Sequence, residues 1–290
     1  MPEITIRGVD HYYEWIGVPG EPVPSGKPVL VFIHGWAGST RYWQSTALAF
    51  AEQFDCLLYD MRGFGRSLLP RPIPAEVEAL GCELDSFADD LALLLDALGI
   101  EKIYLNAHST GGSVAVIFLN RYSQRVERAI LTCNGVFSYN ALAFKTFHFF
   151  AGYVVAFRPS WLKSIPTVDR LFMARFVRQP LPKATNRAFL EDFLTADQEV
   201  ALGTVYTAVS QKAAEEMPGE FARLTVPTLL ISGEFDQIIP VELGRTAAAL
   251  SDKVEHVILK NTAHFPMLED SETYLKVTRS FLRESAIASA

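Results

Sequence analysis

The sequence predicts an α/β domain in which a mostly parallel sheet is covered by helices on both faces and interrupted by a helical insertion. Continuous apolar runs, such as residues 28–33, suit strands that are buried on both faces. These runs alternate with segments whose apolar residues recur at helical spacing, as in residues 85–98, and this alternation indicates a parallel, doubly wound sheet. The alternation stops after Cys133 and returns at Pro227, so an insertion lies between them.

The first part of the chain predicts edge strands followed by buried strands. Apolar residues near alternate positions in residues 3–17 indicate two antiparallel strands joined at Gly8. Thr40 is the expected cap of a helix that carries Trp43 and Phe50 on its apolar face. The remaining elements expected here are buried strands at 28–33, 56–59 and 103–105, a glycine-broken turn at 60–67, and a helix at 85–98 that ends at Gly99.

The second part of the chain predicts more strands of the same sheet. The expected elements are strands at 129–133, 227–232 and 257–259, a helix at 242–250, and a last helix from about Ser271. We therefore expect residues 1–136 and 218–290 to form the core, and residues 137–217 to form the helical insertion.

A strand meets a helix at Ser109, within the run Lys-Ile-Tyr-Leu-Asn-Ala-His-Ser-Thr-Gly-Gly at residues 102–112. Such a junction turns within a few residues, which strains the serine backbone and requires small residues two positions before and after it. Ala107 and Gly111 occupy these positions. The common pattern has glycine at the first of them, and alanine is still small enough to fit. The pattern predicts that Ser109 is a nucleophile.

A serine hydroxyl is a weak nucleophile, so it needs a histidine as base and usually a carboxylate to orient that histidine. His264 follows the last predicted strand and Asp236 follows the strand before it. The chain order is therefore serine, acid, histidine. Two other acids compete with Asp236, but Glu234 lies within the tight turn and Asp252 precedes its strand.

The other histidines have less suitable positions than His264. We expect His11 and His256 in surface strands, His108 at the free middle position of the strand–helix turn, and His148 in the insertion. None of these four follows a late strand of the sheet, so none is expected to act as the base.

Acyl transfer to serine also needs two backbone N–H groups aimed at the developing oxyanion, each worth ~3 kcal/mol of transition-state stabilisation. Thr110, the residue after the nucleophile, is the first candidate. The second is Trp36, in the loop at residues 34–38 that follows an early buried strand. Glycines at positions 35 and 38 let this backbone approach a substrate closely. We expect His34 to brace the loop rather than act as a second base.

With these motifs the chain resembles the α/β-hydrolase superfamily, in its serine esterase and lipase-like branch, over nearly all of its length except the insertion. The motifs are His-Gly-Trp-Ala-Gly at 34–38, Asp-Met-Arg-Gly-Phe-Gly-Arg-Ser at 60–67, Ala-His-Ser-Thr-Gly-Gly at 107–112, and the late Asp236 and His264. The resemblance implies Ser109 as nucleophile, Asp236 and His264 as its partners, Trp36 and Thr110 as oxyanion donors, and the insertion as a lid.

This resemblance implies hydrolysis of a lipophilic carboxylic ester or thioester through an acyl-enzyme intermediate, without a metal ion or cofactor. Serine at the nucleophile position argues against the haloalkane dehalogenase and epoxide hydrolase branches, which use a carboxylate. Three other reactions on the same residues stay open: acyl transfer, C–C bond hydrolysis and cofactor-free perhydrolysis. A hydrolase-like protein that only binds a small apolar ligand is also open, although the complete serine, acid and histidine set argues against it.

The composition of the chain limits the classes of partner and the cellular compartment that we expect. A net charge of −7 argues against nucleic acid as a partner. The cysteines, Cys56, Cys82 and Cys133, are odd in number and lack CxxC spacing, which favours a reducing compartment. The first residues lack the basic and apolar regions of an export signal, so we expect the cytoplasm. Nothing in the sequence determines the oligomeric state.

The insertion differs in charge from the rest of the chain. Residues 137–190 hold eight Lys or Arg against one acid, Asp169, so this segment is +7 while the whole chain is −7 and the remainder is −14. Aromatic residues crowd its first part, which favours medium or long acyl groups. Residues 141–157 are too short for a membrane span of ~20 residues. We expect an interfacial or pocket-lining helix and peripheral contact with an anionic membrane; the alternative is an ordinary lid with a solvated basic rim.

Overall fold

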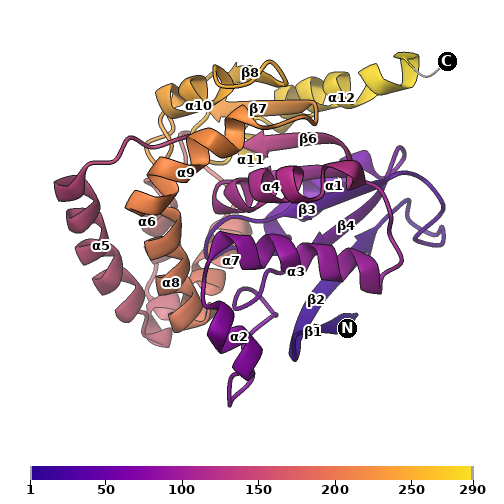
Figure 1. The fold of residues 1–290 in the computed structure, drawn as a ribbon. Helices are drawn as coiled ribbons and strands as arrows, with labels where there is room; N and C mark the ends of the chain where they lie inside the picture. Colours follow the sequence, from indigo (N-terminus) through magenta and orange to yellow (C-terminus); the bar gives the residue numbers. More distant parts are fainter. Residues whose placement is uncertain (1, 289–290) are drawn as a thin grey trace.

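The computed structural model describes residues 2–288, which form an eight-stranded sheet with helices on both faces (Figure 1). The strand order is β1-β2-β4-β3-β5-β6-β7-β8. The β1–β2 and β2–β4 pairs are antiparallel, and all the other neighbouring pairs are parallel. The strands are β1 (Glu3–Ile6), β2 (Val9–Ile16), β3 (Val29–Ile33), β4 (Asp55–Tyr59), β5 (Ile103–His108), β6 (Val126–Thr132), β7 (Thr228–Gly233) and β8 (Val254–Leu259). The predicted α/β fold class is confirmed.

The described helices fall between the strands, in the long connection from β6 to β7, and after the last strand, β8. Those outside that connection are η1 (Thr40–Trp43), α1 (Gln44–Phe50), α2 (Ala75–Leu80), α3 (Leu84–Ala97), α4 (Thr110–Arg121), η2 (Ser123–Arg125), α10 (Val241–Ala248), α11 (Pro266–Glu269) and α12 (Ser271–Ala288). Those within it are α5 (Ala141–Ala156), η3 (Ser160–Ser164), α6 (Val168–Met173), α7 (Lys183–Thr195), α8 (Gln198–Ala208) and α9 (Gln211–Ala222).

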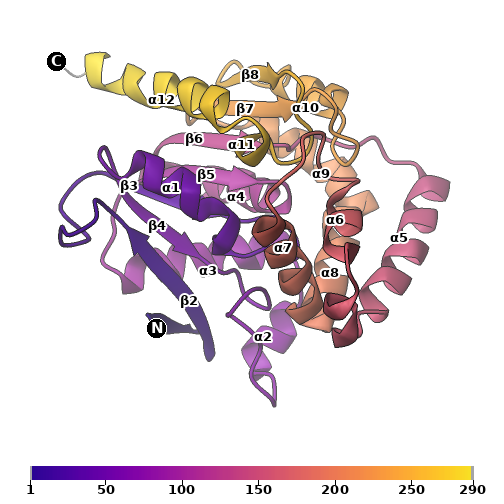
Figure 2. The same cartoon turned by 180° about the vertical axis from the view of Figure 1, so that it is seen from behind.

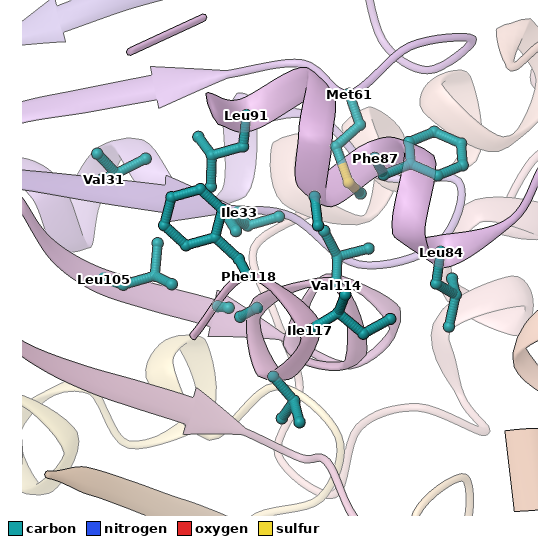
Figure 3. Close-up of a cluster of buried hydrophobic side chains, with 14 of the residues drawn as sticks. Val31, Ile33, Met61, Leu84, Phe87, Leu91, Leu105, Val114, Ile117 and Phe118 are labelled. Carbon is teal, nitrogen blue, oxygen red and sulfur yellow. The ribbon is translucent and has the colours of Figure 1, made fainter. Parts of the chain in front are cut away.

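The sheet separates two hydrophobic clusters, because successive side chains of a strand point to opposite faces. In β3, Val31 and Ile33 belong to the cluster under α3 and α4, which Figure 3 shows. Leu30 and Phe32 belong to the cluster on the other face, under α1 and α12. The two faces explain why the predicted strands are continuous apolar runs rather than alternating ones.

The cap predicted at Thr40 is wrong by one residue. Ser39 is the N-cap of η1, and its side-chain oxygen accepts a hydrogen bond from the Arg41 N–H at 3.3 Å. Thr40 is the first residue of η1, and its N–H donates to a carboxylate oxygen of Asp60 at 2.7 Å. The chain therefore enters a short 3₁₀ turn before α1, and the turn is held by the Asp60 carboxylate.

We use the name lid for the helical segment from α5 to α8, which lies beyond one end of the sheet in both overall views (Figures 1 and 2). The core–lid boundary expected between residues 217 and 218 falls inside α9. Met217 and Phe221 of α9 are buried in the same cluster as α4. The division of the chain into a core and a lid domain stays a prediction, and α9 packs with the core.

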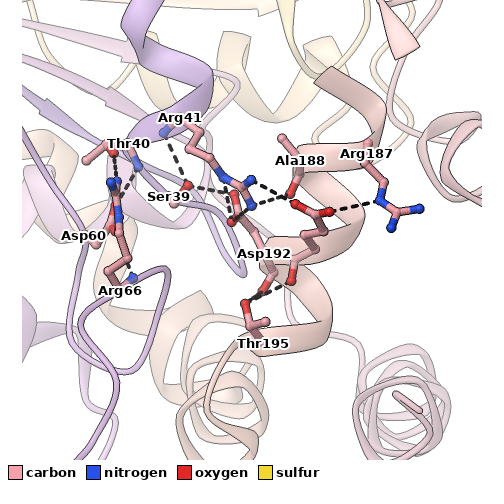
Figure 4. A network of polar contacts seen from close by, with 10 residues as sticks. Ser39, Thr40, Arg41, Asp60, Arg66, Arg187, Ala188, Asp192 and Thr195 are labelled. Carbon is pink, nitrogen blue, oxygen red and sulfur yellow. Dashed lines mark hydrogen bonds and ion pairs between the residues drawn. The ribbon is translucent and has the colours of Figure 1, made fainter. Parts of the chain in front are cut away.

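A polar network joins α7 of the lid to the loop before α1 (Figure 4). The Ser39 hydroxyl donates to the Asp192 carboxylate at 2.7 Å. The Arg41 guanidinium pairs with Asp192 and, at 3.1 Å, with Glu191, and it also donates to the Ala188 carbonyl. The Asp192 carboxyl is buried, and burial raises its pKa although the bonds from Arg41 and Ser39 act in the opposite direction. This network holds α7 against the core.

Candidate active site

Ser109 stands at the turn between β5 and α4 with φ 53° and ψ −122°, a conformation that L-residues rarely adopt. The turn is tight because the backbone of α4 approaches the loop after β3. A Cβ on Gly111 would lie 2.3 Å from the carbonyl oxygen of His34. Ala107 is fully buried in β5, where it pairs with Ile33 and Leu131 of the neighbouring strands, so its methyl group is accommodated. The predicted strand–helix turn is present with alanine at its first small position.

The structure brings Ser109, His264 and Asp236 together from three segments of the chain. The Nε2 atom of His264 lies 3.1 Å from the Ser109 hydroxyl oxygen, and its Nδ1 atom lies 2.8 Å from an Asp236 carboxylate oxygen. Asp236 follows β7 and His264 follows β8, at the carboxyl ends of the parallel strands. Ser109 is half-buried, whereas His264 and Asp236 are buried. Ser109 is therefore the most accessible of the three residues.

The Asp236 carboxylate is held in one orientation. Its second oxygen accepts hydrogen bonds from the N–H groups of Ile238 at 2.8 Å and Ile239 at 3.0 Å. Both of these donors are backbone groups in fixed positions, so they hold the carboxylate in place. The other Asp236 oxygen therefore faces His264. A carboxylate acceptor at Nδ1 places the imidazole proton there and leaves Nε2 free to accept the proton of Ser109.

The two predicted oxyanion donors belong to segments that adjoin Ser109. Thr110 is the first residue of α4, so its N–H is one of those that a helix leaves without an internal partner. The loop that carries Trp36 lies against Ser109, since a Cβ on Gly35 would be 3.2 Å from the Ser109 Cβ. Within residues 2–288, neither the Trp36 nor the Thr110 backbone N–H donates to another group.

The loop at residues 34–38 is braced by His34, as expected. One ring nitrogen of His34 bonds to the Gly35 carbonyl at 2.8 Å, and the other accepts the N–H of Met61 at 2.8 Å. Burial lowers the pKa of His34, which keeps its ring neutral. The Trp36 indole N–H donates to the Ala201 carbonyl of α8 at 2.8 Å, so the loop also contacts the lid.

Aromatic side chains of the lid cover the space between the Trp36 loop and His264. Phe193 contacts Trp36 at 5.9 Å between ring centroids, Phe172 contacts Phe193 at 5.0 Å, and Phe176 contacts Phe172 at 5.8 Å. The Phe176 carbonyl also accepts the backbone N–H of His264 at 2.9 Å. These rings come from α6, α7 and the segment between them, whereas the sequence left residues 141–157 open as an interfacial or a pocket-lining helix.

His108 belongs to a buried hydrogen-bond chain that connects the Gly35 loop to His264. Its Nε2 atom lies 2.7 Å from the His264 carbonyl, which can only accept, so Nε2 carries the ring proton. Its Nδ1 atom then accepts from the Tyr42 hydroxyl at 3.1 Å, and that hydroxyl accepts the N–H of Gly35. Burial, with a smaller effect from His264, holds the pKa of His108 well below its usual value.

His108, His264 and Cys133 place possible metal-ligand atoms within 4.8 Å of one another. All four imidazole nitrogens of the pair already contact protein groups. The Cys133 thiol lies 3.6 Å from the Ala263 carbonyl, and burial raises its pKa well above the usual value. A metal ion would need a thiolate and would displace the His264 contact to Ser109 or to Asp236, so this group fits a hydrogen-bonded site better than a metal centre.

Sequence reasoning missed Glu269, which fixes the His264 loop. One carboxylate oxygen accepts the N–H groups of Ala263 and Phe265 at 2.9 and 3.2 Å, and the other accepts those of Arg178 and Gln179 at 2.6 and 2.9 Å. Glu269 therefore holds the residues on both sides of His264 and ties them to the segment that follows α6. Its position in the short helix α11 has no sequence signal that distinguishes it from a surface acid.

The competing candidates lie outside this arrangement. Glu234 is bonded to Lys260 and to the Asn261 N–H, and Asp252 pairs with Lys253 on the surface.

The other histidines also have partners outside this arrangement. The prediction that His11 lies at the surface is wrong: His11 is buried, with Nδ1 on the Val9 carbonyl at 3.0 Å. His256 bonds to the Ser232 hydroxyl, and His148 of α5 bonds to the Val209 carbonyl at the end of α8.

Residues 28–271 match the model of the alpha/beta hydrolase fold family, and the chain belongs to this family. Among curated relatives, a bifunctional esterase/perhydrolase of Acinetobacter calcoaceticus is 24% identical over 96% of this chain and 98% of its own. A non-heme chloroperoxidase of Kitasatospora aureofaciens is 25% identical over 91% of this chain and 92% of its own.

Among solved structures, a thermophilic esterase from Thermogutta terrifontis has a TM-score of 0.76 at 23% identity, covering 98% of this chain and 99% of its own. At this identity the likeness shows the fold. Family membership supports a hydrolase. Because relatives at similar identity are named for different reactions, it does not define the substrate.

Proposed function

We propose that the chain hydrolyses a carboxylic ester or thioester of a lipophilic substrate, with Ser109 as nucleophile. The observation that carries the proposal is the series of contacts from the Ser109 hydroxyl through His264 to Asp236. In this arrangement Nε2 of His264 takes the hydroxyl proton while the Ser109 oxygen forms a bond to the carbonyl carbon. The N–H groups of Trp36 and Thr110 are the donors for the resulting oxyanion.

The same imidazole completes the reaction. His264 returns the proton to the departing alkoxide or thiolate, which leaves an acyl group on Ser109. It then takes a proton from water as the water oxygen bonds to the acyl carbon, and it passes that proton to the Ser109 oxygen as the acid is released. No step uses a metal ion or a cofactor. The phenylalanines between Trp36 and His264 support an apolar acyl group, because each methylene they bury adds ~0.8 kcal/mol of binding.

Perhydrolysis is the second candidate, favoured by the esterase/perhydrolase relative. There hydrogen peroxide replaces water as the attacking group and the product is a peracid. Acyl transfer replaces water by another acceptor, and C–C bond hydrolysis replaces the leaving heteroatom by carbon. Assays of the acyl-enzyme with water, peroxide and an alcohol compare the acceptors directly, and an acyl-chain series of esters and thioesters compares the leaving groups.

The test of the nucleophile is a fluorophosphonate probe, which labels activated serines. We expect an adduct on wild type and none on Ser109→Ala, with ester turnover lowered by ~10⁶ in the variant and the fold retained by circular dichroism. Ser113→Ala, which changes a serine one turn further along α4, is the matched control and should keep the adduct. An adduct on Ser109→Ala, or near-normal hydrolysis by it, contradicts the proposal. Absence of adduct on wild type indicates a protein that only binds its ligand.

A further inference from the structure

Helix α5 exposes an apolar surface that is unusual for a helix surrounded by water. Leu142 is 76% exposed, Phe150 63% and Tyr153 64%. Val155 is the one buried residue described in this helix. In both overall views α5 lies at the outer edge of the lid, on the side away from the sheet (Figures 1 and 2). The exposed large apolar residues on and just after α5 are Leu142, Phe147, Phe149, Phe150, Tyr153, Val154, Phe157 and Trp161.

The face of α5 opposite the exposed one packs against helix α8. The Asn140 side chain caps α5 by accepting the Ala143 N–H at 3.0 Å. On the inner face, the His148 ring lies 4.8 Å from that of Tyr206 in α8, and a Cβ on Gly152 would lie 3.1 Å from the Tyr206 hydroxyl. The orientation of α5 is therefore set by α8, and the outward direction of its phenylalanines follows from it. Large contiguous apolar patches of this kind mark protein or membrane contacts.

Basic residues that lack acidic partners lie on α5 and in the segments that follow it in the chain, η3, α6 and the turn after α6. Lys145, Lys163, Arg170 and Arg175 are exposed, and none of them forms an ion pair within the described part of the chain. Three other arginines of the segment are already engaged with the protein. Arg158 donates to backbone carbonyls, Arg178 lies over the Phe235 ring at 4.7 Å, and Arg187 pairs with Glu191.

We propose that α5 docks on an anionic bilayer and lies in its interfacial layer. Its sixteen residues span about 24 Å, less than the ~30 Å hydrocarbon core. None of the helices in residues 2–288 is long and apolar enough to cross a membrane. Tyr153 and Trp161 have the amphipathic rings that suit the headgroup level, and the unpaired basic residues attract anionic headgroups.

The charge pattern favours a lipid surface over a second copy of the chain. In a symmetric dimer built on α5, the same patch would face itself. The segment of residues 137–190, at +7, would then approach the same positive segment of the other copy. An anionic bilayer instead neutralises these charges while it covers the apolar face. The acidic remainder of the chain, at −14, is repelled by the same bilayer, so docking turns the lid towards the lipid.

The experiment is co-sedimentation with vesicles of zwitterionic phosphatidylcholine, with and without a third of anionic phosphatidylglycerol, at low and high salt. The apolar variant carries Leu142→Gln, Phe150→Gln and Tyr153→Gln. The basic variant carries Lys145→Gln, Lys163→Gln, Arg170→Gln and Arg175→Gln. All seven side chains are exposed, so both variants should keep the fold. The matched controls on the core are Leu48→Gln, at an apolar side chain 54% exposed, and Lys276→Gln, at an exposed lysine of α12.

Wild type and both controls should bind the anionic vesicles at low salt and bind weakly to phosphatidylcholine alone. Each Lys or Arg removed should weaken binding by ~5-fold, and the salt dependence should shrink with it. The apolar variant should bind weakly at every salt concentration. The emission of Trp161 should shift to the blue on binding, and Trp161→Phe should remove that shift.

No binding by wild type at low salt overturns the proposal, as does equal binding by wild type and both variants. Concentration-dependent dimerisation of wild type that the apolar variant abolishes, without vesicle binding, assigns α5 to a second copy instead. None of these measurements uses ester turnover, so they test the lipid contact independently of the proposed reaction.

Discussion

Replacement of Asp236 by asparagine tests the proposed role of the buried acid most sharply. The side chain keeps its shape, but one of its oxygens becomes an NH₂ group. The existing oxygen at the Ile238 and Ile239 N–H groups must stay an oxygen, because an NH₂ group cannot accept from them. The NH₂ group then faces Nδ1 of His264, forces the proton onto Nε2, and leaves no acceptor for the Ser109 hydroxyl.

The size of the effect follows from the two backbone donors. Turning the amide round would restore the productive tautomer, but it would leave two buried N–H groups without acceptors, at ~1–3 kcal/mol each. The productive arrangement is therefore rarer by a factor between ~30 and ~3 × 10⁴. The variant also loses the negative charge that stabilises the imidazolium. A loss of ~10⁴ in turnover, as in other triads with this change, is the expected result.

The assay is hydrolysis of p-nitrophenyl butyrate by wild type and Asp236→Asn, with thermal melting to check the fold. Asp252→Asn is the control, because Asp252 is exposed and distant in sequence from the strand end that carries Asp236. His264→Ala should lose more than Asp236→Asn, since it removes the base itself. If Asp236→Asn kept a tenth or more of wild-type turnover, the tautomer argument would be wrong.

Three further predictions concern the turn, the buried histidine and the acyl pocket. Gly111→Ala should lower turnover by at least ~10²-fold, because the added Cβ meets the His34 carbonyl. Ala107→Gly should keep turnover within a few-fold of wild type and reduce stability by ~1 kcal/mol. Equal turnover by the two variants contradicts this prediction. Wild type should lose stability as pH falls below about 6.5, because His108 takes up a proton in the unfolded chain but stays neutral where it is buried in the folded protein. Between pH 7.5 and 5.5, the free energy of unfolding from urea titrations should therefore fall by ~1.4 kcal/mol less in His108→Gln than in wild type. An equal fall in the two proteins contradicts this prediction. The kcat/KM of wild type for p-nitrophenyl esters should rise from acetate towards octanoate, and it should rise less in Phe172→Ala. A steady fall in kcat/KM from acetate to decanoate excludes the apolar pocket.

Local patterns in the sequence were enough to predict the sheet and the positions around it. The strands are apolar runs bounded by glycine and polar turns, so their order along the chain is readable without a structure. A parallel sheet places the carboxyl ends of its strands along one edge. The residues after the strands, Ser109, Asp236 and His264, were therefore expected to meet there, and the structure places them in contact.

Contacts between distant segments were decided only by the tertiary structure. The proton positions on His108 follow from the hydroxyl of Tyr42 and the carbonyl of His264, which lie far from it in sequence. The bonds from Glu269 to both sides of His264 and to the segment after α6 depend equally on folding. A single acid or tyrosine has no periodicity, so its sequence position does not indicate its partners.

The lid shows the same division most clearly. Composition identified an aromatic and basic insertion, but it could not distinguish the phenylalanines that lie between Trp36 and His264 from those that face outwards. The packing of α5 on α8 turns Phe149 and Phe150 to the surface. The attachment of α7 through Asp192 places Phe193 beside Trp36. A helix that is apolar all round has no preferred face, so its neighbours in the folded protein decide which side is buried.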